Sequence, residues 1–318
     1  MNDCVDIVIL FVDMNDPEWR IKYNNYVEIH EIPNKHINND TRFRDYGSLK
    51  VVLRSIDLYA SWVNNVFLVV QSESQVPIWI NKKTVKIVLH EDFIPKEYLP
   101  TFNCNTIETH LHFIPGLSEK FIYFNDDMLL NSIVHPEDFF INNKCIHYIN
   151  QLSSNRNLKN DIVKFYQKLR FSNVIELYKI GYNYLDSVFF NSHGPTPMLK
   201  SLCEDIYKRI NITDYITTFR DSKNLTQELF TVYALIKRQL IIPINSRNTN
   251  FTANGDSNGQ YTFTNHNDCK FNLFSDIFKT FCINDVFNND LLYSNDFLYD
   301  EIEKLLFNRF PNKSKYEL

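Results

Sequence analysis

The chain has 318 residues, of which 44% are hydrophobic and 15% aromatic, and its formal net charge is −5 at pH 7. This apolar content suffices for a large core and excludes an intrinsically disordered chain. The weakly acidic balance argues against a nucleic-acid-binding protein, which normally carries a basic stripe, although a nucleotide could still bind through a metal ion.

The first half of the chain alternates between strand and helix patterns. Short apolar, β-rich runs predict strands at residues 6–12, 66–70, 85–89 and 121–124. A proline start or helical spacing predicts helices from Pro17 onward and over residues 48–59 and 105–113. This alternation predicts an α/β fold with a Rossmann-like, mostly parallel, doubly wound sheet. Residues 1–150 would form this α/β core.

Strand patterns become sparse from about residue 150. Helical patterns cover residues 158–178, 198–210, 225–237 and 296–307, with one short strand at 241–244 and an Asn-rich loop at 245–267. We therefore predict a helical C-terminal annex over residues 151–318. It would fold over the sheet edge rather than form an independent domain.

Several absences narrow the class further. No segment approaches the roughly 20 apolar residues that span a bilayer, and no basic segment precedes the N-terminal apolar run, so we expect a cytoplasmic protein. The six cysteines lack CxxC spacing, which indicates reduced thiols. The six glycines form neither GxGxxG nor GxxxxGK[ST], so a bound phosphate would be held by a metal ion, Arg, Lys or a helix N-terminus.

Two adjacent carboxylates, Asp126 and Asp127, follow the strand predicted at 121–124. The carboxyl ends of the strands form the ligand-binding edge of an open α/β sheet. Paired carboxylates at that edge would hold a divalent ion that bridges phosphate oxygens. The alternative is a solvated Asp-Asp turn.

Asp13, Asn15 and Asp16 follow the first predicted strand and would share this edge. Asp16 could instead be the N-cap of the helix that begins at Pro17.

Arg42 and Arg44 are two residues apart in a loop, so in an extended chain both would point the same way and grip a diphosphate. The alternative is a surface pair or a salt bridge to Asp45, which could also cap the next helix.

A polar stripe is predicted on the helix at 105–113, because Asn105, Glu108 and His112 stand at i, i+3 and i+7. This stripe suits a binding site, although it could be a solvated face. His193 lies in a stiff, proline-flanked turn that could position a general base, or it is a structural histidine. Arg220 and the pair Asn284-Asp285 carry no signal individually.

Taken together, these segments closely resemble the Stealth family of sugar-phosphate transferases. That family includes bacterial capsule and cell-wall polysaccharide phosphotransferases and the animal enzyme that adds GlcNAc-1-phosphate to lysosomal glycoproteins. Its four conserved regions resemble, in order, residues 6–19, 42–70 with 99–128, 193–202 with 217–230, and 281–287. Cys104 departs from the family, which usually has Ser there, and so does Gly194, where a bulkier residue is common.

The resemblance implies transfer of a hexose-1-phosphate from a UDP-sugar to a hydroxyl of a growing polysaccharide. UMP would be released and a phosphodiester formed in capsule or cell-wall synthesis. The partners would be a nucleotide-sugar donor and a lipid-linked or polysaccharide acceptor. The setting would be the cytoplasm, with peripheral association at the inner face of the plasma membrane.

The resemblance also implies roles for individual residues. Asp126 and Asp127 would bind Mg²⁺ or Mn²⁺, bordered by Asp13 and Asp16, while Arg44 and Arg220 would hold phosphate charge. His193 is the first candidate for the general base, followed by Glu108 and His112. Substrate binding is assigned to six residues: Asn15, Asp16, Arg42, Asn103, Asn105 and Asn125.

Two other functions fit the same residue types. A conventional metal-dependent glycosyltransferase also uses paired aspartates at a strand end, but it would release UDP. A non-catalytic carbohydrate-binding protein would use the 18 Tyr and 26 Phe to stack on sugar rings and would turn nothing over.

Overall fold

The computed structural model describes residues 4–30, 32, 38, 40–147, 149–151, 161–182, 189–191, 194–242, 260–262, 279–284 and 295–318. At its centre is a five-stranded sheet in the order β10-β4-β1-β2-β3. Its strands are β1 (Val5–Leu10), β2 (Val66–Val70), β3 (Val85–Leu89), β4 (Lys120–Asn125) and β10 (Thr196–Leu199). β1 pairs in parallel with β2 and β4, β2 pairs in parallel with β3, and β10 is antiparallel to β4. The predicted α/β fold with a mostly parallel sheet is confirmed.

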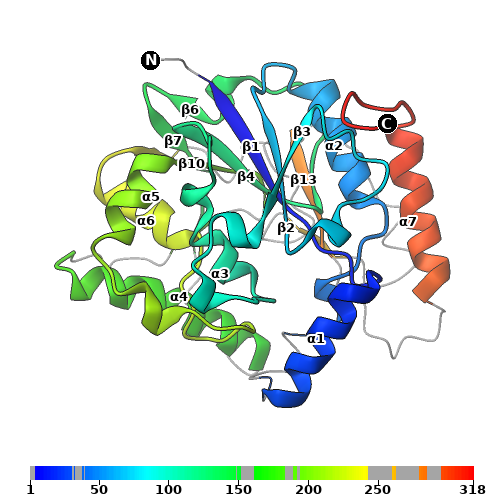
Figure 1. Ribbon diagram of the computed structural model, residues 1–318. Helices are drawn as coiled ribbons and strands as arrows, with labels where there is room; N and C mark the ends of the chain where they lie inside the picture. The colour runs from blue at the N-terminus through cyan, green and yellow to red at the C-terminus, as the bar shows by residue number, and fades with distance from the viewer. Residues whose placement is uncertain are drawn as a thin grey trace.

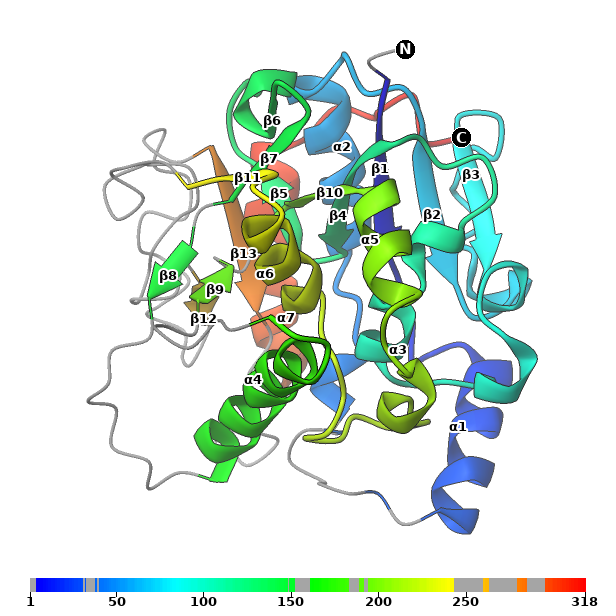
Figure 2. The same cartoon turned by 90° about the vertical axis from the view of Figure 1, so that its left-hand side faces the viewer.

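Helices cover both sides of the sheet. They are α1 (Pro17–Ile29), α2 (Ser48–Tyr59), α3 (Cys104–Glu108), α4 (Asp161–Lys179), α5 (Lys200–Tyr207), α6 (Glu228–Ile236) and α7 (Asn295–Arg309). α2 and α7 lie on one side and α5 and α6 on the other (Figures 1 and 2). All six residues of β1 are buried, as expected for a parallel strand covered on both faces. One hydrophobic core joins the sheet to α2, α5 and α6.

The strand order places a switch point beside β1. The chain builds β2 and β3 on one side of β1 and then returns to place β4 on the other. Leu10 is in register with Asn125, so the carboxyl ends of β1 and β4 lie side by side. In open α/β sheets, ligands bind in the crevice outside the strands at such a point.

The short strands are β5 (Met128–Leu130), β6 (Phe140–Ile141), β7 (Lys144–Ile146), β8 (Ile149–Gln151), β9 (Phe189–Asn191), β11 (Leu240–Ile241), β12 (Gln260–Thr262) and β13 (Thr280–Asn284). They form the sheets β11-β7-β6 and β12-β13-β5 and the pair β8-β9.

The prediction of a helical C-terminal annex is not confirmed. β10 belongs to the central sheet and β13 pairs with β5, so the second half of the chain contributes strands as well as helices. The helix predicted from residue 198 begins at Lys200, because Met198 and Leu199 pair with β4. The helix predicted over residues 296–307 is confirmed as α7. Most of the predicted loop at 245–267 lies outside the described residues, and the boundary near residue 150 stays a prediction.

The single helix predicted over residues 105–113 is wrong. α3 ends at Glu108, and a separate 3-10 turn covers Leu111–Phe113. The Thr106 carbonyl oxygen, which would accept the next helical hydrogen bond, lies 3.0 Å from the Thr109 hydroxyl and 2.7 Å from Nδ1 of His110. Side chains that compete for a backbone carbonyl in this way end a helix.

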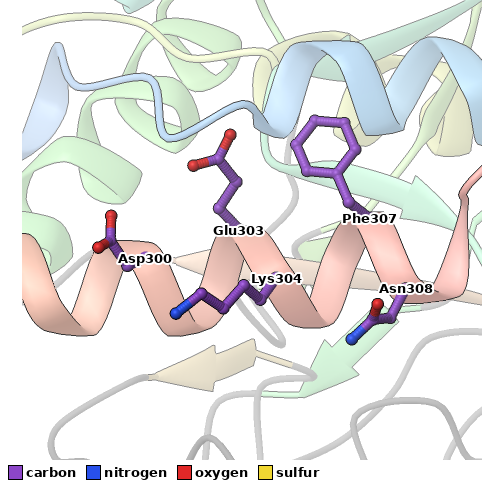
Figure 3. A pocket seen from close by; sticks show the side chains of 5 residues that line it. All are labelled: Asp300, Glu303, Lys304, Phe307 and Asn308. Atoms are coloured by element: carbon purple, nitrogen blue, oxygen red, sulfur yellow. The ribbon is translucent and has the colours of Figure 1, made fainter.

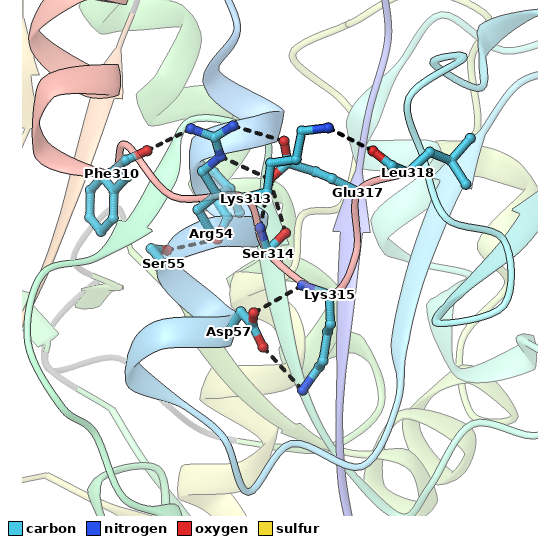
Figure 4. Close-up of polar contacts among 10 residues, drawn as sticks. Arg54, Ser55, Asp57, Phe310, Lys313, Ser314, Lys315, Glu317 and Leu318 are labelled. Carbon is cyan, nitrogen blue, oxygen red and sulfur yellow. Dashed lines mark hydrogen bonds and ion pairs between the residues drawn. The ribbon is translucent and has the colours of Figure 1, made fainter.

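The segment after α7 packs on α2 (Figure 4). The Arg54 guanidinium donates to both carboxylate oxygens of Glu317 at 2.8 Å and to the carbonyl of Phe310 at 2.6 Å. Asp57, one turn further along α2, accepts from the Lys315 N–H at 3.0 Å. Within the described residues, no helix combines the length and apolarity needed to cross a bilayer.

Candidate active site

Four aspartates gather where β1 and β4 end, and we call Asp13, Asp45, Asp126 and Asp127 the acidic cluster. Burial raises the pKa of Asp126 well above its usual value, and the charges of Asp127 and Asp45 raise it further. Burial also raises the pKa of Asp45, with the charge of Asp13 adding to the effect. The predicted meeting of the residues after β1 and β4 is therefore present. So many facing carboxylates need a cation or protons to balance them.

The acidic cluster supplies the oxygen ligands that Mg²⁺ and Mn²⁺ prefer. The four aspartates interact through their charges, but among the residues that the structure describes no group of three or more His, Cys, Asp or Glu side chains could hold a metal ion by itself. Asp126 and Asp127 instead fit the common magnesium arrangement, in which one or two carboxylates hold the ion and waters and substrate phosphates complete its shell.

The turn after β1 uses its two aspartates differently. Asp16 is the N-cap of α1, with Oδ1 accepting from the Glu18 N–H at 3.1 Å. Its Oδ2 accepts from the Ser74 hydroxyl at 2.8 Å and from Nε2 of Gln75 at 2.7 Å. Burial would raise the pKa of Asp16, but these hydrogen bonds lower it overall. The capping role is confirmed, and both oxygens of Asp16 are engaged within the protein.

Asp13 is the member of the acidic cluster that belongs to the turn after β1. Its Oδ1 accepts from the N–H of the exposed Asn15 at 2.8 Å, and its charge acts on Asp45. Arg42 and Arg44 flank this turn, because the Met14 N–H donates to the carbonyl of the residue between them at 2.8 Å. Both arginines are partly buried.

Glu108 ends α3 in a buried polar network. It accepts from the hydroxyl of Tyr123 on β4 at 2.9 Å and from the Gln227 N–H at 3.3 Å. The same hydroxyl also contacts Oδ1 of Asn125. Burial raises the pKa of Glu108, and these hydrogen bonds and the charge of Arg220 oppose the rise. Glu108 is therefore less acidic than an exposed glutamate.

Arg42 and Arg220 converge on the same place from distant parts of the chain. Burial raises the pKa of the Cys104 thiol to about 12, while the charges of Arg220 and Arg42 pull it down and that of Glu108 raises it. The structure therefore brings the charges of both arginines to Cys104 and that of Arg220 to Glu108, which neither arginine's sequence surroundings indicated.

Asparagines hold the loop that carries Arg220. Asn38 accepts from the Arg220 N–H at 3.0 Å and donates to its carbonyl at 3.1 Å. Asn103 is fully buried, caps α3 through the Asn105 N–H, and donates to Oδ1 of Asn224 at 3.0 Å. Asn103 and Asn105 were predicted to bind substrate, and both are buried. The side-chain amide of Asn103 donates to the loop that carries Arg220.

An aromatic cluster lies beneath these loops, formed by Trp19, Tyr23, Phe43, Phe102 and Phe219. Phe102 stacks on Phe219 with ring centroids 5.5 Å apart, and Trp19 packs at 5.0 Å from Phe43. The three phenylalanines directly precede or separate predicted site residues along the chain. Their packing fixes the loops of Arg42, Asn103 and Arg220 relative to one another.

The two candidate histidines differ in what the structure says of them. His193 lies outside the described residues, as does Asp285. His112 is 1% exposed, with its ring 4.0 Å from that of Phe113 and 5.0 Å from that of Tyr207 between centroids. Burial lowers its pKa to about 3, so it accepts protons weakly at neutral pH. Because the predicted helix ends at Glu108, the i, i+7 argument for His112 is wrong.

A shallow cavity lies along α7 (Figure 3). It is lined by Asp300, Glu303, Lys304, Phe307 and Asn308. All five belong to one helix, and no predicted site residue lines the cavity.

Three well-placed residues were missed by the sequence analysis as parts of a site. Asp45 was considered only as a cap or an ion-pair partner. The N-cap position of α2 is Gly47, and Asp45 instead accepts from the Ser48 hydroxyl at 3.0 Å. Tyr123 is indistinguishable in sequence from a buried strand residue. Gln75 carries no local signal, because its partners lie about sixty residues earlier.

Known proteins resemble this chain over its full length. Residues 42–148 match the model of Stealth protein CR2, conserved region 2. The chain is 30% identical over 350 aligned residues to the capsular polysaccharide phosphotransferase WcwK of Streptococcus pneumoniae, covering 98% of each. It is 45% identical over 146 residues to the capsular polysaccharide phosphotransferase CpsJ of Streptococcus thermophilus, covering 44% of this chain and 59% of that one. Among solved structures, the galactosyltransferase LgtC with donor and acceptor sugar analogues aligns with 94% of the chain, at 12% identity and a TM-score of 0.43. The full-length match to WcwK, together with the match to the conserved region, shows that the chain belongs to the Stealth family and is a phosphotransferase.

Proposed function

We propose that this enzyme transfers a hexose-1-phosphate from a UDP-sugar to a hydroxyl of a growing polysaccharide and releases UMP. The product would be a phosphodiester linkage in capsule or cell-wall polysaccharide. The observation that carries the proposal is the meeting of the acidic cluster with a turn flanked by Arg42 and Arg44, at the switch point between β1 and β4. This combination of carboxylates and guanidinium groups suits a metal-bound diphosphate.

The chemistry is an in-line displacement at phosphorus. The acceptor oxygen forms a bond to the phosphorus that bears the sugar, and the bond from that phosphorus to the oxygen of UMP breaks. Mg²⁺ or Mn²⁺ held by Asp126 and Asp127 would neutralise the charge that develops on the leaving phosphate. Arg44 and Arg220 would bind the remaining phosphate oxygens, and positioning by such groups supplies most of the catalysis in phosphoryl transfer.

The acceptor hydroxyl must lose its proton to a base, and we retain His193 for this role. Glu108 is the second candidate, because its raised pKa brings it closer to the range of a useful general base. His112 is a weaker candidate, because burial among aromatic rings lowers its pKa to about 3.

We further propose that the enzyme acts in the cytoplasm at the inner face of the plasma membrane. A lipid-linked acceptor would be presented there, and peripheral association would suffice to reach it. The relatives' names, capsular polysaccharide phosphotransferases, support a polysaccharide acceptor.

The test follows the β-phosphate of the donor. Purified enzyme is incubated with UDP-hexose labelled in the β-phosphate, Mg²⁺ and a lipid-linked oligosaccharide. Sugar-phosphate transfer moves the label to the acceptor and leaves unlabelled UMP. Asp127→Asn should lower this rate about 10²–10³-fold by removing a group that acts on the transition-state charge.

The matched control is Asp300→Asn, an exposed aspartate on α7, which should leave the rate unchanged. Label recovered in UDP would replace the proposal with a glycosyltransferase. Donor binding without any turnover would instead indicate a carbohydrate-binding protein.

A further inference from the structure

Gln75 is a buried amide that joins the end of β2 to the turn after β1. It closes the 3-10 turn Glu73–Gln75 and is 2% exposed. Its Oε1 accepts from the Asp13 N–H at 2.8 Å, and its Nε2 donates to the Asp13 carbonyl at 3.0 Å. The same Nε2 donates to Oδ2 of Asp16 at 2.7 Å.

These contacts restrain Asp13 from both sides of its backbone. A side-chain amide that pairs with the N–H and the C=O of one residue acts as a neighbouring strand would, and it holds that residue's backbone direction. The next residue is held as well, because the Met14 N–H donates to the carbonyl of Phe43 at 2.8 Å. The Asp13 carboxylate extends from this restrained backbone, where its Oδ1 accepts from the Asn15 N–H at 2.8 Å and its charge acts on Asp45.

We propose that Gln75 is a positioning residue that directs the Asp13 carboxylate toward the other three aspartates of the acidic cluster. It would thereby set the cluster's affinity for a divalent cation. The activity readout rests on the proposed function, but the cation readout does not. Asp13 and Gln75 are 62 residues apart in the chain. Asp13 follows β1, and Gln75, in the turn after β2, restrains its backbone.

The contact between Gln75 and Asp16 can be tested with substitutions that leave the net charge unchanged. Gln75→Leu removes all three hydrogen bonds without changing net charge. The double variant Gln75→Glu with Asp16→Asn also keeps net charge, because the carboxylate and the amide change places. In the double variant the new carboxylate can accept from the Asp13 N–H and from the new amide, which restores two of the three contacts. The third is not restored, because a carboxylate oxygen then faces the Asp13 carbonyl oxygen to which Nε2 of Gln75 donates at 3.0 Å. Asn is as good an N-cap as Asp, so α1 keeps its cap.

The measurement is the affinity for Mn²⁺, followed as the loss of the free-ion electron paramagnetic resonance signal. We expect Gln75→Leu to weaken Mn²⁺ binding about tenfold and to raise the donor KM more than it lowers kcat. The double variant should bind Mn²⁺ more tightly than Gln75→Leu and more weakly than the wild-type protein, since it rebuilds two of the three contacts. Ser74→Ala is the matched control: it removes one bond to Oδ2 of Asp16 without touching Asp13, and it should change Mn²⁺ affinity less than twofold.

Three results would overturn the proposal. They are wild-type Mn²⁺ affinity in Gln75→Leu, no recovery in the double variant, and no Mn²⁺ binding by the wild-type protein. If the Mn²⁺ pattern holds but no UMP forms, the role of Gln75 stands and the proposed reaction fails.

Discussion

At the scale of single residues, His112 predicts how the protein responds to acid. Its pKa of about 3 in the folded state lies below the usual 6.5 because burial disfavours the charged ring. As the pH falls from 6.5 toward 3, the unfolded protein binds a proton at His112 and the folded protein does not. The free energy of unfolding is therefore highest above pH 6.5 and decreases over this range. The loss approaches about 1.4 kcal/mol per pH unit, or about 2 kcal/mol by pH 5.

The check is urea unfolding at pH 7 and pH 5. His112→Phe keeps the aromatic packing and removes the titration, so its stability should fall less between the two pH values than that of the wild-type protein. His30→Phe changes an exposed histidine and serves as the control. Equal pH dependence in wild type and His112→Phe would show that His112 is not kept neutral by its surroundings.

The candidate site divides into residues that the sequence could and could not reveal. Asp13, Asp126 and Asp127 follow apolar strands, and the carboxyl ends of neighbouring parallel strands must meet, so their approach was predictable. Gln75 and Tyr123 were not, because each acts through a contact that exists only after β1, β2 and β4 have aligned.

Among the elements, the start of α2 depends on a glycine. Gly47 has a φ of +81°, which an L side chain adopts only at a cost, and a Cβ there would lie 3.2 Å from Cε2 of Phe307 on α7. We expect Gly47→Ala to destabilise the protein by about 1–2 kcal/mol from the backbone, with a further loss from the contact with Phe307. The midpoint of urea unfolding measures the total.

Gly116→Ala is the matched control for this contact. Gly116 has a similar φ of +74°, but nothing lies within 4 Å of the Cβ position. It should show the backbone cost alone, so the difference between the two variants reports the packing of α7 on the start of α2. If Gly116→Ala were the more damaging change, this packing would be looser than the structure indicates.

Helices and strands were predictable where the spacing of apolar residues alone determines the element. α2 buries Leu49, Val52, Leu53 and Ile56 at helical spacing and was predicted with its observed bounds. α3 was not, because side-chain bonds to the Thr106 carbonyl interrupt a pattern that still looks helical. β10 was mistaken for the start of a helix, since its strand character comes from pairing with β4.

At the scale of the whole molecule, Arg54 fastens the segment after α7 to the core. The side chains of Arg54 and Glu317 are 10% and 4% exposed and bond through both carboxylate oxygens. Arg54→Met would leave the carboxylate of Glu317 buried without its cation, which costs about 3 kcal/mol. The free energy of unfolding in urea measures the loss.

A second variant separates the pair from its surroundings. Arg54→Met with Glu317→Gln removes both charges, so it should lose less stability than the sum of the single changes. Additive losses would mean that the two charges do not interact. Lys82→Met, which breaks the exposed pair with Glu73, should change stability by less than about 1 kcal/mol.

The position of β4 in the sheet has a consequence for the order of folding. Asp13 and Asp45 belong to the part of the chain that precedes β2, whereas Asp126 and Asp127 arrive with β4 on the opposite side of β1. The complete set of four carboxylates therefore forms only when β4 docks, and the repulsion between the two pairs opposes that step. A cation that binds the completed cluster would favour the docked state by mass action. If Mg²⁺ or Mn²⁺ binds there as proposed, the ion would also stabilise the pairing of β4 with β1.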